Sequence, residues 1–314
     1  MGSAAIVFFL INLYFLHSPG FASMPVDRER TRFVFQKLNR QLDKLANKPQ
    51  PNDVHQFRTY SRRLQALLEE LPPKLSRNDK KLLKLLGRLR RRAGRVRDLD
   101  VQIAALHSLK IPQEPRRKAQ LLDALTEMRG KRERKLHDSL DKVTTRELGK
   151  RLKKAAKNYE IAETTEPLRV ARQRLTDVSK PQLPLTEDVL HQYRIAGKRA
   201  RYVAELAGKA PEAEPFIRSL VSMQDALGDW HDWWLLSQSA EKIIHDAPDS
   251  ALLSALHNVT GAKFRHAVRV VTEMRKGLFG TATSIDGAKR AQSGVAASSR
   301  KPSTSHTEPV RATA

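Results

Sequence analysis

Apolar residues recur three and four positions apart along most of this chain, from Val26 to Gly277. The clearest stretch holds Leu82, Leu86 and Leu89. This spacing places the apolar side chains on one face of an α-helix. No stretch alternates apolar and polar residues with the period of two that a β-sheet requires. The pattern therefore predicts an all-α fold.

Turn and capping residues predict where the helices begin and end. The first helix, with Phe33, Leu38, Leu42 and Leu45 as its apolar face, ends near Pro49. We expect Asn52 or Asp53 to cap the second helix, which ends near residue 71, and Ser76, Asn78 or Asp79 to cap the third, which Gly94 bends or breaks. Further helices are expected at about 116–142, 145–158, from Thr186, and at 214–227, 230–244 and 250–274, with a helix fragment and a loop over 163–184.

Both ends of the chain lie outside this pattern. Residues 1–23 are mostly apolar but too short for an ordinary membrane span, and they lack the basic start of a typical signal peptide. We interpret them as an extension, either a signal peptide or the result of a misplaced start before Met24. Residues 280–314 are rich in Gly, Ala, Ser and Thr without apolar periodicity, which predicts a disordered tail. The folded domain is therefore expected at 24–279.

A basic segment occurs twice within this domain. His55-Gln56-Phe57-Arg58 is followed by Arg62-Arg63, and His191-Gln192-Tyr193-Arg194 is followed at the same spacing by Lys198-Arg199. A second pair of landmarks lies downstream in the same order: Gly94 to Asp98, and Gly228 to Asp232. The repetition predicts an internally duplicated fold of two similar helical bundles, at about 24–145 and 146–279.

Charge narrows the class of partner. The chain carries 58 Lys and Arg against 34 Asp and Glu, a formal net charge of +24, and no cysteine. The absence of cysteine excludes disulfides and thiolate metal sites. The positive charge indicates a polyanionic partner, namely nucleic acid, polyphosphate or an anionic membrane surface.

The basic residues are arranged on helix faces. At about 100° per residue, His55, Arg58 and Arg62 share one side of a helix, and His191, Arg194, Lys198 and Arg201 share the equivalent side in the second copy. Like charges on one side repel one another, which favours a bound anion. The third helix adds Arg88, Arg91, Arg92 and Arg95, and arginine suits phosphate because a guanidinium donates two parallel hydrogen bonds. Two copies facing each other would make one concentrated positive site.

Other residues give weaker signals. Asp98, Asp100, Asp225, Asp229 and Asp232 match no metal motif, so we expect Asp98 and Asp232 to orient arginines or cap helices. The chain shows no nucleophile–base signature and no Gly-rich phosphate loop, and we expect neither a catalytic site nor a cofactor. Trp230, Trp233 and Trp234 fit helix-bundle packing better than base stacking.

The repeated motifs resemble those of a known family, the CHAD domain (conserved histidine α-helical domain). The resemblance rests on His55-x-x-Arg58 with Arg62-Arg63, on residues 94–101, on residues 191–202 and on residues 224–232. It implies two similar halves about a pseudo-twofold axis, with basic residues lining a central cavity, and binding of inorganic polyphosphate, often at polyphosphate granules. The polyphosphate-binding residues that it and the basic helices imply are His55, Arg58, Arg62, Arg63, Arg88, Arg91, Arg92, Arg95, Arg97, His191, Arg194, Lys198, Arg199 and Arg201.

Two features set this chain apart from its implied relatives. In the second copy Asp229-Trp230-His231 stands where the first has Arg95-Val96-Arg97, so the two halves cannot contribute equally. The ExExK motif of the triphosphatase domain that some relatives carry is missing, which favours a stand-alone binding module rather than an enzyme. We expect a cytoplasmic protein without stable membrane insertion, or an exported one if residues 1–23 are a signal peptide.

Three alternatives use the same basic surface. As an RNA-binding or other nucleic-acid-binding protein it would need base contacts or stacking. Non-specific attraction of nucleic acid would need only the positive charge. It could cleave polyphosphate or phosphate esters, which needs bound Mg²⁺ and a carboxylate cluster. It could also be a scaffold that docks other proteins onto granules.

Histidines near neutral pH would tighten binding of a polyanion under mildly acidic conditions.

Overall fold

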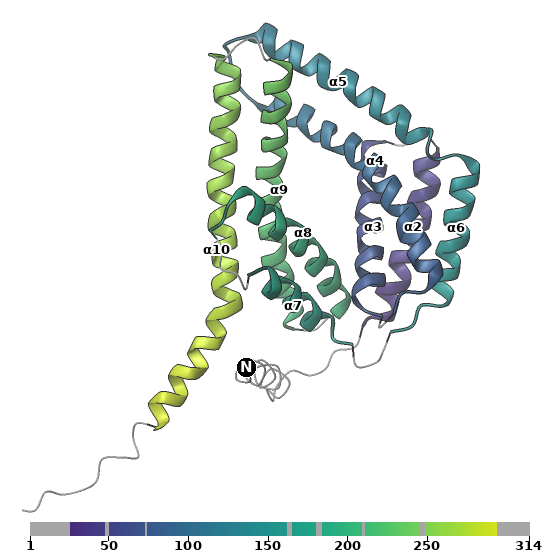
Figure 1. Cartoon of the computed structure of the whole chain (residues 1–314), viewed down its shortest axis with the longest axis vertical. Coiled ribbons are helices and arrows are strands. Elements are labelled where there is room, and N and C mark those ends of the chain that lie inside the picture. The colour runs from purple at the N-terminus through teal and green to yellow at the C-terminus, as the bar shows by residue number, and fades with distance from the viewer. Residues whose placement is uncertain are drawn as a thin grey trace, which may run out of the picture. The chain divides into compact units, whose positions relative to one another are not determined.

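The computed structural model describes residues 26–47, 50–72, 74–161, 165–179, 184–208, 211–244 and 249–293, with side chains to residue 278. These described residues contain helices and turns but no strand, so the predicted all-α class is confirmed. The helices, shown in Figure 1, are α2 (Arg28–Ala46), α3 (Pro51–Glu70), α4 (Arg77–Ser108), α5 (Pro115–His137), α6 (Lys142–Lys157), α7 (Pro167–Ser179), α8 (Glu187–Ala204), the 3-10 turn η1 (Glu205–Ala207), α9 (Ala213–Ile243) and α10 (Ala251–Ser293).

The chain divides into two compact units, Met1–Met274 and Arg275–Ala314. In the first unit α3 packs between α2 and α4, and α8 packs between α7 and α9. Helices α3 and α8 also contact each other, which brings the two repeated segments to one interface. Helix α6 packs on α2 and α4. In the second unit the described backbone is the end of α10.

Helix α5 links the group formed by α2, α3, α4 and α6 to the group formed by α7, α8 and α9. It runs along α4 and contacts α9 (Figure 1). One apolar core there combines Leu106 of α4, Leu121 and Leu125 of α5, Leu236 of α9 and Leu252 of α10, all fully buried. Since this core draws on helices from both groups, the first unit is not two independent bundles. The internal duplication stays a prediction.

Local capping explains most of the helix starts. Ser76 caps α4, because its hydroxyl accepts a hydrogen bond from the Asp79 backbone N–H at 3.1 Å. Thr186 caps α8 in the same way through Val189, at 3.4 Å. The predicted cap of α3 was wrong. The N-cap is Gln50, and Asp53 lies inside the helix, where its carboxylate accepts from the Gln50 backbone N–H at 3.1 Å.

Several helix boundaries differ from the predicted ones. Helix α4 continues through Gly94, and α9 is uninterrupted from Ala213 to Ile243 where two helices were expected. Burial explains both, since Gly94 and Trp230 face packed neighbours and tertiary contacts outweigh the low helix propensity of glycine. The boundary between α5 and α6 lies earlier than expected, because Asp141 caps α6 through the Thr144 N–H at 2.6 Å.

Burial at the N-terminal helix and the length of the last helix also differ from expectation. Phe33 was predicted in the core but its side chain is 47% exposed and packs edge-on against Tyr60, while Val34 and Phe35 are buried. Helix α10 continues to Ser293, so the backbone of residues 280–293, assigned to the tail from the sequence, is helical. No proline interrupts that stretch. Residues 1–25 and 294–314 lie outside the described residues, and they include the whole predicted extension, 1–23, and the rest of the predicted tail.

Candidate functional site

The repeated basic segments meet across the contact between α3 and α8. Lys198 of α8 has Arg194 of its own helix and Arg62 and Arg58 of α3 as its main charged neighbours. The positive charge of Arg97, in α4, is close enough to His55, Arg58 and Asp232 to favour a lower pKa for each. We call this group the α3–α8 cation cluster; it consists of Arg58, Arg62, Arg97, Arg194 and Lys198. Sequence reasoning predicted this grouping of the two copies.

Arg58 is held in place by α4. Its Nη1 lies 3.3 Å from Asp98 Oδ1 and 3.4 Å from the carbonyl oxygen of Gly94, and its side chain is only 13% exposed. The guanidinium packs over Gly94, where an added Cβ would meet Nη2 at an ordinary contact distance of 3.7 Å. Asp98 therefore orients an arginine, as expected, and does so from the middle of a helix rather than from a cap.

Burial shifts the pKa values of Lys198 and Asp232, two groups at the cluster, in opposite directions. Burial and the neighbouring cations lower the pKa of Lys198 to about 6, with Asp232 opposing the shift. Burial also raises the pKa of Asp232, although Arg194 and Lys198 favour its charged form. Lys198 is therefore largely neutral near pH 7.5 in the unliganded protein. Near pH 7.5, positive charge at this position therefore requires an anion that compensates for it.

Three histidines border the cluster. The rings of His191 and His231 lie 5.6 Å apart, and His231 stacks on Trp234 at 5.7 Å. Burial and nearby cations lower the pKa of His231 to about 3, and they also lower the pKa of His55. His55 and His231 are consequently neutral near pH 7 and act there as hydrogen-bonding groups. The sequence predicted that histidines supply the charge added at mildly acidic pH. The lowered pKa values favour Lys198 over His55 and His231 in that role.

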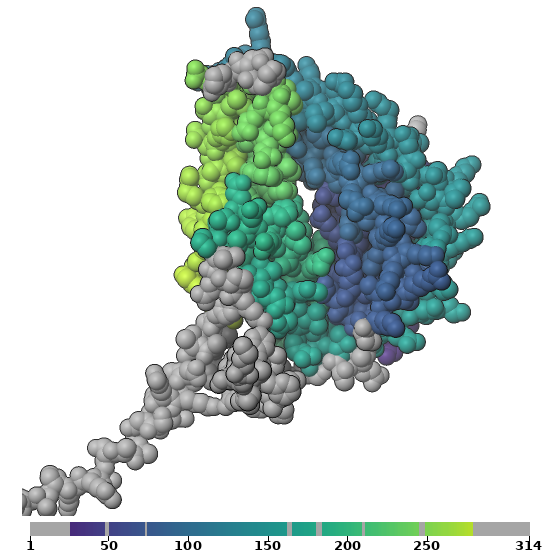
Figure 2. All heavy atoms as spheres, in the orientation of Figure 1, coloured from purple at the N-terminus to yellow at the C-terminus, as the bar shows by residue number. Residues whose placement is uncertain are grey.

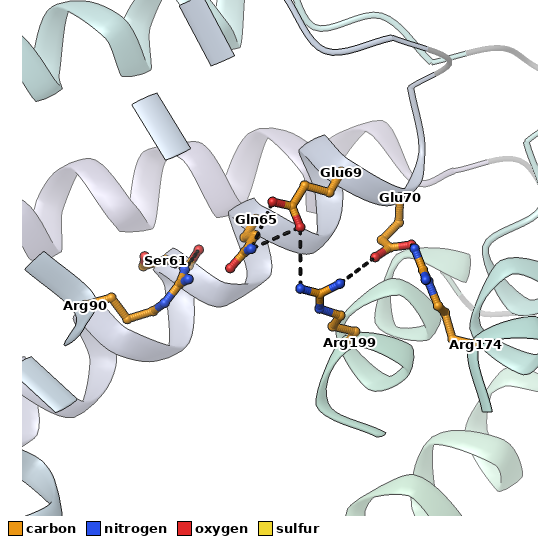
Figure 3. Close-up of polar contacts among 7 residues, drawn as sticks. All are labelled: Ser61, Gln65, Glu69, Glu70, Arg90, Arg174 and Arg199. Carbon is orange, nitrogen blue, oxygen red and sulfur yellow. Dashed lines mark hydrogen bonds and ion pairs between the residues drawn. The ribbon is translucent and has the colours of Figure 1, made fainter. Parts of the chain in front are cut away.

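Three other predicted residues lie in ion pairs where α3 meets α8 and η1. Arg63 Nη2 lies 2.9 Å from Glu205 Oε2, and Arg201 Nε lies 2.9 Å from Glu205 Oε1. Arg199 reaches Glu69 at 3.8 Å and Glu70 at 3.7 Å (Figure 3). These side chains are therefore engaged with carboxylates. Ligand contact by Arg63, Arg199 and Arg201 stays a prediction.

Ion pairs of Glu70 stabilise the interface of α3 with α7 and α8. Its side chain is 3% exposed, and Arg174 of α7 approaches it at 2.6 Å while Arg199 of α8 approaches from the other side (Figure 3). An isolated buried carboxylate is costly, so the two guanidiniums and Glu70 stabilise one another. The interface that carries the cluster is thereby held by charges from α3, α7 and α8.

The basic strip of α4 is divided between two sides of the helix. Arg97 belongs to the cluster, whereas Arg88, Arg91, Arg92 and Arg95 are exposed. Arg92 and Arg95 line a cavity between α4 and α5 instead. The packing of α4 therefore does not favour one common site that contains Arg97 together with these arginines.

Sequence reasoning missed Arg90. Its Nη1 lies 3.4 Å from the Ser61 carbonyl oxygen and 3.4 Å from Ser61 Oγ (Figure 3), and burial lowers its pKa to about 10. Arg90 is four residues after the buried Leu86, a spacing that turns it toward α3. That spacing was a usable signal, because a cation on the packed side of a helix needs a polar partner.

Comparison with known proteins identifies the family. A family model described as the CHAD domain matches residues 31–241, which is more than half of the chain. This chain belongs to the CHAD domain family. The prediction made from the repeated motifs is thus confirmed.

Solved structures agree on the CHAD fold. The crystal structure of the CHAD domain from the plant Ricinus communis matches with a TM-score of 0.57 at 17% identity, covering 84% of this chain and 95% of that chain. PptA from Streptomyces chartreusis matches with a TM-score of 0.55 at 17% identity, covering 83% and 99%. No curated protein sequence matches this one. At these identities the structural likeness shows the fold alone.

Two further findings bear on the site and its surroundings. Within the described residues no group of three or more His, Asp or Glu side chains is arranged to hold a metal ion. None of the helices in that part of the chain is both long and apolar enough to cross a membrane.

Proposed function

We propose that this CHAD protein binds inorganic polyphosphate through the α3–α8 cation cluster. The observation that carries the proposal is the convergence of Arg58, Arg62, Arg97, Arg194 and Lys198 from three helices, with Asp98 and Asp232 as nearby carboxylates. Partly buried like charges repel one another, and a polyanion relieves that repulsion. The family association with polyphosphate supports the choice of ligand.

The physical form of the ligand fits the arrangement. Polyphosphate is a flexible chain with about one negative charge per phosphate, so it follows cations presented along two facing helices. Guanidiniums donate paired hydrogen bonds to phosphate oxygens, and binding releases counterions. Figure 2 shows an opening between the green atoms of the α8–α9 region and the purple and blue atoms of the α2–α4 region. We propose that the basic cavity implied by the family lies here.

The site is proposed to bind without catalysis. Asp98 is paired with Arg58, and Asp232 faces Arg194 and Lys198. Metal-assisted phosphoryl transfer needs carboxylates that are free to hold divalent cations, and here both would have to leave their cationic neighbours. A role in bringing the protein to polyphosphate granules follows from binding alone.

Nucleic acid is the competing ligand. Recognition of single-stranded RNA uses exposed aromatic rings for stacking. Near the cluster, Trp230 is buried at 2% exposure and Trp234 is covered on one face by His231. The aromatic residues of this region therefore serve packing, and we propose that RNA binds only through general charge attraction.

The test measures binding of long-chain polyphosphate to the full chain at physiological salt, with single-stranded RNA as competitor. The variant combines Arg58→Gln, Arg62→Gln, Arg194→Gln and Lys198→Gln. The control changes four exposed lysines of α6 to Gln, Lys150, Lys153, Lys154 and Lys157, and so removes the same formal charge. We expect about a 100-fold or greater loss of affinity in the cluster variant and about threefold or less in the control.

Two results would overturn the proposal. One is an equal loss in the cluster and control variants, which would reduce binding to general charge attraction. The other is RNA displacing polyphosphate as readily as polyphosphate displaces RNA. A thermal unfolding curve of each variant separates loss of binding from loss of fold.

A further inference from the structure

A second basic cavity lies between α4 and α5. Its volume is about 380 Å³, and its lining consists of Arg92, Arg95, Arg132, Lys135 and Asp138. Two of the cations come from α4 and two from α5, and these helices pack against each other over much of their length (Figure 1). Four cations thus surround one space with a single carboxylate.

This cavity is separate from the α3–α8 cation cluster. Arg95 and Arg97 are two residues apart on α4, which places them about 200° apart around the helix axis. Arg97 belongs to the cluster, whereas Arg95 lines the cavity. The body of α4, about 10 Å across, lies between the two groups. One phosphate group cannot contact both.

The cations of the cavity differ from other cations of α5 in their partners. Arg129 is paired with Asp100 at 2.6 Å and with Glu133 at 2.9 Å, and Lys131 is paired with Glu127 at 2.6 Å. Within the described part of the chain, no ion pair or side-chain hydrogen bond involves Arg92, Arg95, Arg132 or Lys135. Carboxylates therefore neutralise Arg129 and Lys131, whereas the four cations of the cavity keep a positive charge that an external anion can neutralise.

The lining indicates which anion fits. All five lining residues are charged, and none is aromatic or apolar. A nucleobase or a lipid tail would therefore find no surface to stack on or to be buried against. Three guanidiniums and an ammonium suit a compact group of several phosphates, because each guanidinium can donate two hydrogen bonds to one phosphate.

We propose that the α4–α5 cavity is a second binding site for condensed phosphate, so that one molecule holds two polyphosphate segments. The inference rests on the proposed function of the cluster for the identity of the polymer. Two sites on opposite sides of α4 make the protein bivalent. A bivalent protein holds a long polymer by avidity and cross-links separate chains.

The first experiment is a calorimetric titration of the full chain with tripolyphosphate, which is too short to reach around α4. The cavity variant combines Arg92→Gln, Arg95→Gln and Arg132→Gln. The matched control changes Lys80, Lys81 and Lys84, three exposed cations of the same helix, to Gln. We expect two molecules of tripolyphosphate per chain in the unmodified protein and in the control, and one in the cavity variant.

The second experiment follows turbidity with long-chain polyphosphate. The unmodified protein and the control should cross-link the polymer, and the cavity variant should bind it without cross-linking. Unchanged stoichiometry in the cavity variant, equal losses in variant and control, or no tripolyphosphate binding at about millimolar concentration would each overturn the second site.

The two proposals fail in distinguishable ways. If the four-residue cluster variant still binds two tripolyphosphate molecules per chain while the cavity variant binds one, the proposed function fails and the second site stands. If the cluster variant loses one of two tripolyphosphate molecules while the cavity variant loses none, the proposed function stands and the second site fails.

Discussion

The two copies of the basic segment have the same residue pattern but different electrostatic surroundings. Arg58 in α3 is bonded to Asp98 and to the carbonyl oxygen of Gly94. Arg194, at the same position in α8, faces Asp232, yet its buried Nε has no hydrogen-bond partner in the described part of the chain. Four residues further on, the first copy has Arg62 and the second has Lys198, whose pKa burial lowers to about 6. The first copy is therefore fixed by its own protein partners, whereas the second keeps an unused donor and a titratable amine.

A repeated sequence motif therefore need not have the same electrostatic surroundings in both copies. A guanidinium remains protonated even when buried. An ammonium loses its proton when the desolvation free energy of the charged form exceeds the stabilisation that nearby groups provide. Arg58 and Arg194 contribute permanent charge, and only Lys198 of the second copy contributes charge that depends on the ligand. Each of the following experiments tests this contrast between the copies.

The largest expected effect comes from removing the arginine whose donor is unused. Arg194→Gln should weaken polyphosphate binding by about 10- to 100-fold, because a charge-assisted hydrogen bond is worth about 1.5–3 kcal/mol. Arg58→Gln should cost less, since part of its hydrogen bonding is already directed to Asp98. Equilibrium binding of both variants at one salt concentration makes the comparison, and a larger loss for Arg58→Gln would reverse the roles assigned to the copies.

The next effect is the pH dependence of binding. A bound polyanion raises the pKa of Lys198, so binding takes up a proton wherever the free amine is neutral, which is above about pH 6. Affinity should therefore rise as pH falls from 8 toward 6.5, by up to about tenfold per pH unit. Calorimetry in two buffers of different ionisation enthalpy measures the proton uptake.

Lys198→Arg is the matched variant for that experiment. Its guanidinium stays protonated over the whole range, so the pH dependence of affinity should flatten. If the slope persists in Lys198→Arg, a group other than Lys198 takes up the proton.

A smaller effect is expected from the counter-ion of the first copy. Asp98→Asn removes the carboxylate that competes with phosphate for Arg58, so polyphosphate affinity should increase by about three- to tenfold. The control is Asp229→Asn, which removes an exposed carboxylate paired with Lys263 at 2.9 Å. A weaker complex after Asp98→Asn would mean that orienting Arg58 matters more than freeing it.

The smallest effect concerns stability. Between about pH 6 and the ordinary lysine value of 10.5, unfolded Lys198 binds a proton that the folded side chain does not. Its contribution therefore destabilises the fold fully below pH 6 and disappears as pH rises toward 10.5. Lys198→Met should raise Tm at pH 7 by a few degrees, about 1 kcal/mol, and remove this slope. An unchanged or lower Tm at pH 7 would show that Lys198 is charged in the folded protein.

Helical periodicity predicted most of the helices but was less reliable at their boundaries. Ser76 capped its helix as one of the predicted alternatives, because a capping box is a local pattern. Gly94 did not interrupt α4, and the predicted break before Trp230 did not occur in α9. Those outcomes depend on packing against other helices, which glycine propensity and short-range spacing do not contain.

Helical spacing and the repeated motifs were sufficient to predict the all-α class, the CHAD family and the side of each helix on which His55, Arg58 and Arg62, or His191, Arg194 and Lys198, lie. These properties follow from helical spacing, which is local. Three other properties depend on how distant helices pack. Arg63, Arg199 and Arg201 pair with Glu69, Glu70 and Glu205, Arg92 and Arg95 line the α4–α5 cavity, and burial lowers the pKa of Lys198. The reason is physical: burial and ion pairing are set by side chains from distant helices, and no spacing along one helix specifies them.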